Sequence, residues 1–322
     1  MIILVTGVAG FIGFHSAKTL LAEGYEVIGV DNLNDYYDVS LKNARLSLLK
    51  SHEKFAFHQL DLAVAGGLEA VLGDRPVTHI LHLAAQAGVR YSLDNPRAYI
   101  SSNVLGHLNV LEYARHLKTL KHFVYASSSS IYGERDAGAF SEQDVVRSPA
   151  SLYAATKISG EMLSESYARL YGIPQTGLRF FTVYGPWGRP DMAYFIFTKK
   201  ILAGEPITLF APDVMRRDFT YVDDIMSVLP RILRSPPKAD ARHKIYNLGN
   251  SRPNRLIRLV EAVETACGRT ATKIIEGQQK GDVASTYANI EKATQDFGFN
   301  PTTSLEDGIS KFVEWYRDFY KI

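Results

Sequence analysis

The chain has 322 residues, of which 46% are apolar and 22% are charged, a balance typical of folded globular proteins and unlike that of disordered or fibrous chains. Its 36 basic and 34 acidic side chains leave a net charge of +2, which lacks the basic excess of most nucleic-acid-binding proteins. The single cysteine, Cys267, excludes an internal disulfide framework and a cysteine-based zinc site.

Membrane and export signals are also absent from the sequence. No apolar run approaches the roughly 20 residues that cross a bilayer. The apolar start of the chain carries no basic segment, and its glycines would interrupt a signal helix. We therefore expect a cytoplasmic protein with no membrane partner, no nucleic-acid partner and no metal.

Short apolar runs alternate with helical patterns over the first 180 residues. Strands are predicted at Ile2–Thr6, Glu26–Val30, Lys54–Gln59, Thr78–His82, His122–Ala126 and Gln175–Phe180. Helices are predicted between them at about 12–20, 41–50, 63–72, 97–117 and 152–171. This alternation predicts an α/β fold built on a doubly wound parallel sheet with right-handed crossovers.

The pattern changes after Phe180, where a loop rich in glycine and proline follows. Helices are predicted at Met192–Ala203, Asp223–Leu233 and Leu256–Cys267, with a mostly helical tail from Asn289. Short extended pieces are predicted at Ile207–Phe210 and Asp218–Val222, and the strand Lys244–Leu248 is expected to rejoin the first sheet. We predict a first domain over 1–180 that also takes in about 218–250, and a smaller, interleaved α/β domain over 181–322.

A glycine-rich turn follows the first predicted strand and opens the first helix. Such a turn lets the backbone approach a pyrophosphate, and the helix N-terminus offers it free N–H groups. The candidate contacts are Gly7, Gly10, Phe11, Ile12 and Gly13. Asp31 ends the second strand, near the offset at which an acid receives ribose hydroxyls and repels a 2′-phosphate, which favours NAD over NADP. A plain turn is the alternative interpretation of the glycines.

Other candidate cofactor contacts lie where further strands end, at the edge where open parallel sheets bind ligands. Asp61 could accept a hydrogen bond from an adenine amino group, or it could cap a helix. Small side chains after the fourth strand would let the cofactor lie against backbone. The residues predicted to contact the cofactor here are Asn32, Asp61, Leu62, Leu83, Ala84 and Ala85.

Tyr153 and Lys157 are predicted to share one helix face, four residues apart. A phenol has an ordinary pKa near 10, but a neighbouring ammonium and a positive nicotinamide ring favour the phenolate and make tyrosine a usable base. The alternative is a surface cation–phenol pair. The serine run that begins at Ser127 ends the fifth strand and could hold the reacting oxygen, or it could be a polar turn.

Together, the glycine turn, Asp31, the serine run and the Tyr-x-x-x-Lys pair resemble the extended short-chain dehydrogenase/reductase family of NAD-dependent epimerases and dehydratases, over about residues 1–320. Four stretches most resemble its UDP-glucuronate 4-epimerase branch: Asp31–Tyr37, Ala87–Ser92, Gly177–Ala193 and Arg217–Asp224. The resemblance implies a Rossmann fold that binds NAD in the first domain and a UDP-sugar in the second. Helices 97–117 and 152–171 resemble those that pair in the family's homodimers.

The resemblance also implies roles for individual residues. Ser128, Tyr153 and Lys157 match the catalytic group, and Lys157 and Asn103 match residues of the cofactor site. For the substrate, Arg217 matches the arginine that grips the UDP pyrophosphate, and Asp282 matches an acid that contacts the uridine ribose.

The positions after Ser128 separate the branches of the family. The dehydratase and UDP-glucuronate decarboxylase branches of the family that this chain resembles carry an acidic residue at these positions. This chain has Ser129 and Ser130 instead. A 4-keto uronate loses carbon dioxide readily unless its carboxylate is held in place. The residues expected to hold it are Ser129, Ser130, Thr182 and Arg189, with Arg90 as a second cation. The alternative for Arg189 is a loop cation in solvent.

The reaction implied by this resemblance is the interconversion of UDP-glucuronate and UDP-galacturonate through transient oxidation at C4 by tightly bound NAD. Two enzymatic alternatives remain open, a UDP-glucuronate decarboxylase and a UDP-galactose 4-epimerase. A non-catalytic NAD-binding sensor on the same fold is a third.

Overall fold

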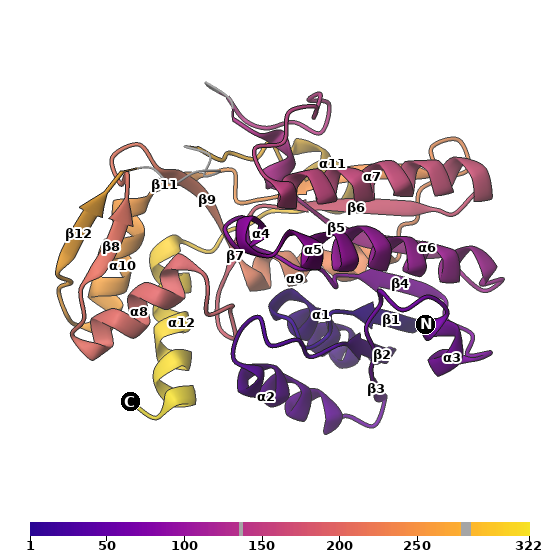
Figure 1. Ribbon diagram of the computed structural model, residues 1–322, viewed down its shortest axis with the longest axis horizontal. Helices are drawn as coiled ribbons and strands as arrows, with labels where there is room; N and C mark the ends of the chain where they lie inside the picture. The colour runs from indigo at the N-terminus through magenta and orange to yellow at the C-terminus, as the bar shows by residue number, and fades with distance from the viewer. Residues whose placement is uncertain (135–137, 278–284) are drawn as a thin grey trace.

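The computed structural model describes residues 1–134, 138–277 and 285–322 (Figure 1). Its centre is a seven-stranded sheet in the order β10-β6-β5-β4-β1-β2-β3, and every neighbouring pair is parallel. The strands are β1 (Ile2–Thr6), β2 (Glu26–Asp31), β3 (Phe55–Gln59), β4 (His79–His82), β5 (His122–Ser128), β6 (Gln175–Phe180) and β10 (His243–Leu248). The predicted doubly wound sheet is confirmed, including the return of the chain at β10.

Helices cover both faces of this sheet, which is why its strands are continuous apolar runs. In β1, Ile3 and Val5 face the core under α1 (Phe11–Ala22) and α9 (Val222–Leu233), whereas Leu4 faces the opposite core under α6 (Gly106–His116). All three side chains are fully buried. The remaining covering helices are α2 (Val39–Lys50), α3 (Gly67–Leu72), α7 (Leu152–Tyr171) and α11 (Glu291–Phe297).

Two predicted helices differ from the structure. The helix expected at 97–117 follows the short α4 (Tyr91–Asp94) and is divided into α5 (Pro96–Tyr99), a π-helical stretch at Ile100–Leu105, and α6. The helix expected at 63–72 begins only at Gly67, because the backbone N–H groups of Ala63 and Val64 bond to the carboxylate and the carbonyl of Asp61 in a turn.

The smaller part of the molecule has its own sheets and core. Strands β7 (Thr182–Tyr184), β9 (Arg216–Tyr221) and β11 (Pro253–Arg255) form one sheet, and β8 (Ile207–Phe210) pairs with β12 (Lys273–Glu276). Helices α8 (Ala193–Ala203), α10 (Leu256–Cys267) and α12 (Leu305–Tyr320) pack around a second hydrophobic core. Helix α9 and β10 contribute to the core of the large sheet, whereas β9 pairs with β7 and β11 in the smaller sheet.

Trp187 lies where the two parts of the molecule meet. Its ring contacts Phe14 of α1 at a centroid distance of 5.4 Å, and Trp315 and Phe319 of α12 at 5.2 Å each. Its backbone is left-handed, with φ 63°, an uncommon conformation for a residue with a bulky side chain. This turn redirects the chain after β7 toward the carboxyl edge of the large sheet. No helix in the described ranges is long and apolar enough to cross a membrane.

Candidate active site

A cavity of about 670 Å³ opens at the carboxyl edge of the large sheet. This is where the sequence places the ligand of a doubly wound fold, because the loops after the strands diverge there. Its lining includes these predicted site residues: Gly7, Gly10, Phe11, Ile12, Gly13, Asp31, Asn32, Asp61, Leu62, Leu83, Ala84, Ala85, Arg90, Ser128, Ser129, Ser130, Tyr153, Lys157, Thr182, Arg189 and Arg217. Residues more than 200 positions apart in the sequence therefore form one site.

The glycine turn fits a dinucleotide because no side chain can be added to it. Gly7 has φ +69°, and a Cβ there would lie 2.7 Å from the backbone nitrogen of Ala84. A Cβ on Gly13 would lie 2.1 Å from the carbonyl oxygen of Gly7. Helix α1 starts after Gly10 with no side-chain cap, so its first N–H groups are available to an anion.

The acids at the ends of β2 and β3 are already hydrogen-bonded within the protein. Asp31 is buried, and its carboxylate accepts from the backbone N–H groups of Ala9 at 3.0 Å and Leu33 at 2.9 Å. Asp61 accepts from the Asn32 side-chain amide at 3.1 Å and from the Ala63 N–H at 2.9 Å. The carboxylate of Asp61 therefore closes a turn and does not cap α3.

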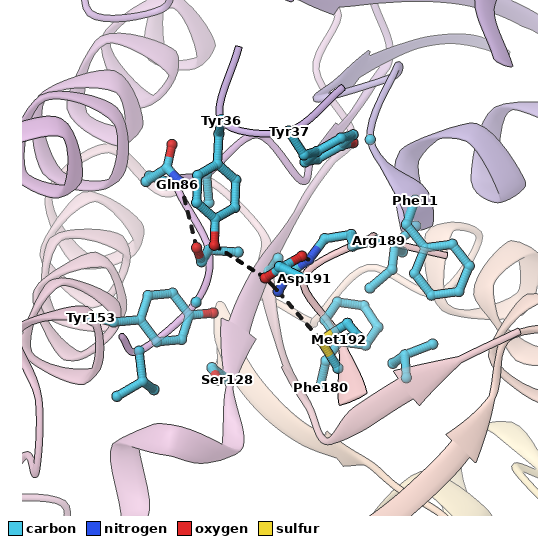
Figure 2. Close-up of a pocket in the computed structure, with 18 of the residues that line it drawn as sticks. Phe11, Tyr36, Tyr37, Gln86, Ser128, Tyr153, Phe180, Arg189, Asp191 and Met192 are labelled. Carbon is cyan, nitrogen blue, oxygen red and sulfur yellow. Dashed lines mark hydrogen bonds and ion pairs between the residues drawn. The ribbon is translucent and has the colours of Figure 1, made fainter. Parts of the chain in front are cut away.

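Tyr153 and Lys157 lie in the first two turns of α7, which begins at its N-cap Ser151. The Lys157 ammonium donates to the carbonyl of Ala126 on β5 at 3.0 Å. Burial lowers the pKa of Lys157 to about 8, and the negative charge of Glu161 opposes that change. Figure 2 shows the Tyr153 hydroxyl pointing into the pocket, on the same side as Ser128 and Arg189.

The pKa of Tyr153 differs from the expectation that Lys157 would lower it. Burial raises the pKa of this phenol because the phenolate loses its hydration, while a hydrogen bond with Ser128 and the positive charge of Arg189 partly offset the rise. The cation that acts on Tyr153 thus comes from a loop after β7, and the Lys157 ammonium is directed to the strand backbone.

A buried ion pair joins α7 to the large sheet. Arg179 of β6 donates to both carboxylate oxygens of Glu161, at 2.9 and 2.8 Å, and Ser127 donates to the same carboxylate at 2.6 Å. All three side chains are almost fully buried. The pair joins α7 to the ends of β5 and β6, so it fixes the distance between Tyr153 and the serine run.

The serine run ends in a short 3₁₀ turn at Ser129–Tyr132, and Ser128, Ser129 and Ser130 line the cavity. Ser128 accepts from the backbone N–H of Ser130 and donates to the hydroxyl of Ser130, both at 3.2 Å. Thr182, at the start of β7, lines the same pocket. Three serines and a threonine thus present hydroxyl groups to one cavity.

Arg189 is paired and mostly buried, which differs from the alternative of a loop cation in solvent. Its Nε and Nη2 groups donate to the Asp191 carboxylate at 3.0 and 2.9 Å, and its side chain is 23% exposed. The Tyr36 hydroxyl donates to the same carboxylate at 3.1 Å (Figure 2). The second predicted cation, Arg90, packs over the ring of Phe210 at 5.0 Å.

Two predicted site residues do not line the described cavity. Asn103, in the π-helical stretch, is buried behind the wall; its amide bonds to both backbone groups of Gln86 and donates to Thr156 of α7. Its side chain therefore ties the π-helical stretch to α7 and to the backbone after β4. Asp282 lies outside the described residues.

Sequence reasoning missed Tyr36 and Asp191, which lie on the cavity wall. Both fall inside stretches that carry the family resemblance, Asp31–Tyr37 and Gly177–Ala193, but nothing in the sequence indicates that they meet. The described residues contain no group of three or more His, Cys, Asp or Glu side chains that could hold a metal ion.

Comparisons with known proteins agree with this geometry. The model of the NAD dependent epimerase/dehydratase family matches residues 3–249. The chain is 47% identical to the protein CapI of Staphylococcus aureus, over 100% of both chains. It is also 47% identical to a UDP-glucuronate 4-epimerase of Arabidopsis thaliana, covering 99% of this chain and 72% of that protein.

Among solved structures, the UDP-glucuronic acid 4-epimerase of Bacillus cereus in complex with UDP-glucuronic acid and NAD superimposes with a TM-score of 0.93. The two chains are 34% identical, and the match covers 99% of this chain and 100% of that one. The chain belongs to the NAD dependent epimerase/dehydratase family.

Proposed function

We propose that this protein is a UDP-glucuronate 4-epimerase, which interconverts UDP-glucuronate and UDP-galacturonate with NAD as its bound cofactor. The observation that carries the proposal is that one cavity combines Tyr153 and Ser128 with the cation Arg189. The Arabidopsis relative carries this name, and the Bacillus cereus structure contains both UDP-glucuronic acid and NAD.

The residues of the first domain suit NAD. The glycine turn and the N-terminus of α1 would receive its pyrophosphate, Asp31 its adenosine ribose, and Lys157 its nicotinamide ribose. The carboxylate of Asp31 excludes a 2′-phosphate by charge repulsion. When bound, NAD supplies the acceptor and then the donor of a hydride at C4 of the sugar.

Tyr153 transfers the proton of the C4 hydroxyl group. Its phenolate removes that proton as the C4–H bond breaks, and its phenol returns the proton after the ketone is reduced. Ser128 lowers the pKa of the Tyr153 phenol and would steady the same oxygen of the sugar. The positive charge of Arg189 favours the phenolate, and the nicotinamide ring would add a second positive charge when bound.

The carboxylate of the sugar is the group that sets this reaction apart from that of a neutral hexose. Ser129, Ser130 and Thr182 offer hydroxyl donors, and Arg189 offers a charge-assisted fork. Arg217 of β9 and Arg90, in the loop after β4, line the same cavity. A diphosphate would lie beside these two cations. The sugar can turn over between oxidation and reduction while its nucleotide stays anchored.

The test is incubation of the purified protein with UDP-glucuronate, followed by separation of the nucleotide sugars. UDP-galacturonate should form without added NAD and without net redox change, because the cofactor stays bound. Tyr153→Phe should lower kcat by about 10²–10⁴-fold, since a positioned acid–base group contributes that much. Absence of UDP-galacturonate with the wild-type protein would refute the proposal.

The product also separates the alternatives. A UDP-glucuronate decarboxylase would give a UDP-pentose with loss of carbon dioxide, and a UDP-galactose 4-epimerase would turn over UDP-glucose. Ser129 and Ser130 in the cavity support the epimerase, because no carboxylate follows Ser128 in the serine run. A non-catalytic NAD-binding sensor would show no turnover.

We further propose a homodimer that forms through α6 and α7. Apolar side chains on these helices and the π-helical stretch remain exposed in the single chain, among them Ile100, Leu105, Met162 and Leu170. A monomer mass in light scattering at micromolar concentration would contradict the dimer. The cytoplasmic location stays a prediction from the sequence.

A further inference from the structure

Arg189 already binds a carboxylate of its own chain, and it does so along one edge only. A guanidinium group has two edges that can form paired hydrogen bonds, the Nε–Nη2 side and the Nη1–Nη2 end. Asp191 occupies the side edge with bonds of 3.0 and 2.9 Å. At the end edge, Nη2 also contacts the sulfur of Met192 at 3.5 Å, a weak acceptor, and no oxygen of the described residues accepts a hydrogen bond from Nη1, so Nη1 remains to lead a stronger acceptor onto this edge.

We propose that Asp191, held by Tyr36, is a positioning residue that directs the end edge of Arg189 at the substrate carboxylate and thereby prevents loss of carbon dioxide during turnover. This inference rests on the proposed function. Asp191 is acidic and lies in the same cavity as the substrate, so its presence beside a site for an anionic sugar needs a reason. The reason is orientation: it fixes a long side chain that otherwise has many rotamers.

Gly88 leaves the space through which the Tyr36 side chain reaches Asp191. The phenol reaches Asp191 from the loop after β2, and it passes over Gly88, whose φ is +97°. A Cβ on Gly88 would lie 2.8 Å from the Tyr36 hydroxyl oxygen. The ring of Tyr91 supports the other side of Tyr36, at a centroid distance of 4.8 Å. The loop that follows Asp31 therefore reaches the residue that orients Arg189.

The backbone before Arg189 is anchored independently of Asp191. Arg45 of α2 is fully buried, and its Nη2 donates to the carbonyls of Trp187 at 2.6 Å and Gly188 at 3.2 Å. Its Nη1 donates to the carbonyl of Ala9 in the glycine turn at 2.8 Å. Loss of the Asp191 charge should therefore free the Arg189 side chain without releasing the loop.

The chemistry at stake is the decay of a 4-keto uronate. When its carboxylate rotates perpendicular to the ketone plane, the C5–C6 bond can break, and its electron pair passes into the ketone to form an enolate. Carbon dioxide leaves, and the enolate takes a proton at C5. The product is a UDP-4-ketopentose, which becomes a UDP-pentose when the hydride taken from C4 is returned to the ketone, and both are counted as pentose products. A carboxylate gripped by a fixed fork cannot reach that geometry easily.

The experiment compares Asp191→Asn with the wild type in the conversion of UDP-glucuronate, with mass spectrometry of the nucleotide sugars and capture of carbon dioxide. The fraction of turnovers that end in a UDP-pentose should rise by about 10–100-fold, because a hydrogen bond between charged groups is lost. Tyr36→Phe should raise it less, because the carboxylate stays. Glu23→Gln is the matched control: it removes the carboxylate from the exposed pair with Arg234 and should leave the fraction unchanged.

A double-mutant cycle assigns the effect to Arg189. In an Arg189→Ala background, Asp191→Asn should add nothing further to the pentose fraction, because there is no fork left to orient. The inference is overturned if folded Asp191→Asn forms no more UDP-pentose than the wild type, or if its effect persists fully without Arg189. Should Asp191→Asn not fold, an unchanged pentose fraction in Tyr36→Phe overturns it instead. Failure of the proposed function gives a different result, since the wild type would then form no UDP-galacturonate.

Discussion

Burial acts on Tyr153 and Lys157 in the same chemical direction, toward their uncharged forms. It raises the pKa of the phenol and lowers the pKa of the ammonium to about 8, because each charged form loses its hydration. The sequence predicted the pairing of the two groups from their spacing. It could not predict these shifts, because the segments that desolvate the pair, β5 and the loop after β7, lie far away in the chain.

The buried Lys157 should make stability depend on pH. Its pKa is about 8 in the folded chain and 10.5 when exposed, so between these values the unfolded chain binds more protons and stability rises with pH. Relative to Lys157→Met, the wild type should gain about 3 kcal/mol in free energy of unfolding between pH 7 and pH 10.5. Urea denaturation of both nucleotide-free proteins at several pH values checks this, and a constant difference between them would contradict it.

Breaking the buried ion pair between Arg179 and Glu161 should lower the free energy of unfolding substantially. Glu161→Gln leaves the buried guanidinium of Arg179 without its counter-charge, so the free energy of unfolding should fall by about 3–5 kcal/mol. Glu306→Gln breaks an exposed pair with Arg258 and should cost no more than about 1 kcal/mol. Equal losses in the two variants, measured by chemical denaturation, would show that burial does not decide the value of the pair.

At the scale of the secondary-structure elements, the glycine turn allows a sharp test of packing. Gly13→Ala would bring a methyl group to 2.1 Å from the Gly7 carbonyl, so α1 must move away from the turn that would hold the pyrophosphate. We expect the purified variant to retain much less NAD than the wild type, measured by nucleotide release on denaturation. Gly24→Ala is the control. Gly24 has φ +84°, and a Cβ added there would meet no other part of the described chain within 4 Å. This variant should therefore lose about 1–2 kcal/mol of stability and keep its NAD.

Sequence patterns locate the buried strands of the large sheet and fail to locate several short elements. Buried parallel strands such as β1 are apolar on both faces, and their predicted positions agree with the structure within a residue or two. The sequence does not indicate β7 and β11, which have three residues each, or β12, whose four side chains are all exposed, because none of them forms a buried apolar run. The π-helical stretch was missed as well, because one extra residue in a helical turn hardly alters the apolar pattern.

At the scale of the whole molecule, the first domain is completed by segments from the second half of the chain. Strand β10 pairs with β6 at the edge of the large sheet, and α9 packs on α1. A fragment that ends at residue 180 would expose the apolar face of α1, so it should lack cooperative unfolding and near-ultraviolet circular dichroism. Adding the fragment 181–322 should restore both signals. A folded, cooperative fragment 1–180 would contradict this prediction.

The position of Trp187 gives the protein an optical probe of its own. The chain has two tryptophans, and their rings lie 5.2 Å apart where the two domains meet. Tryptophan fluorescence, excited at a wavelength that the 18 tyrosines hardly absorb, therefore reports on this one junction. Trp187 is two residues from Arg189, and its carbonyl accepts a hydrogen bond from Arg45, so a shift of this loop moves one fluorophore against the other. Ligand titrations can follow the emission of the unmodified protein, and Trp315→Phe would isolate the signal of the loop.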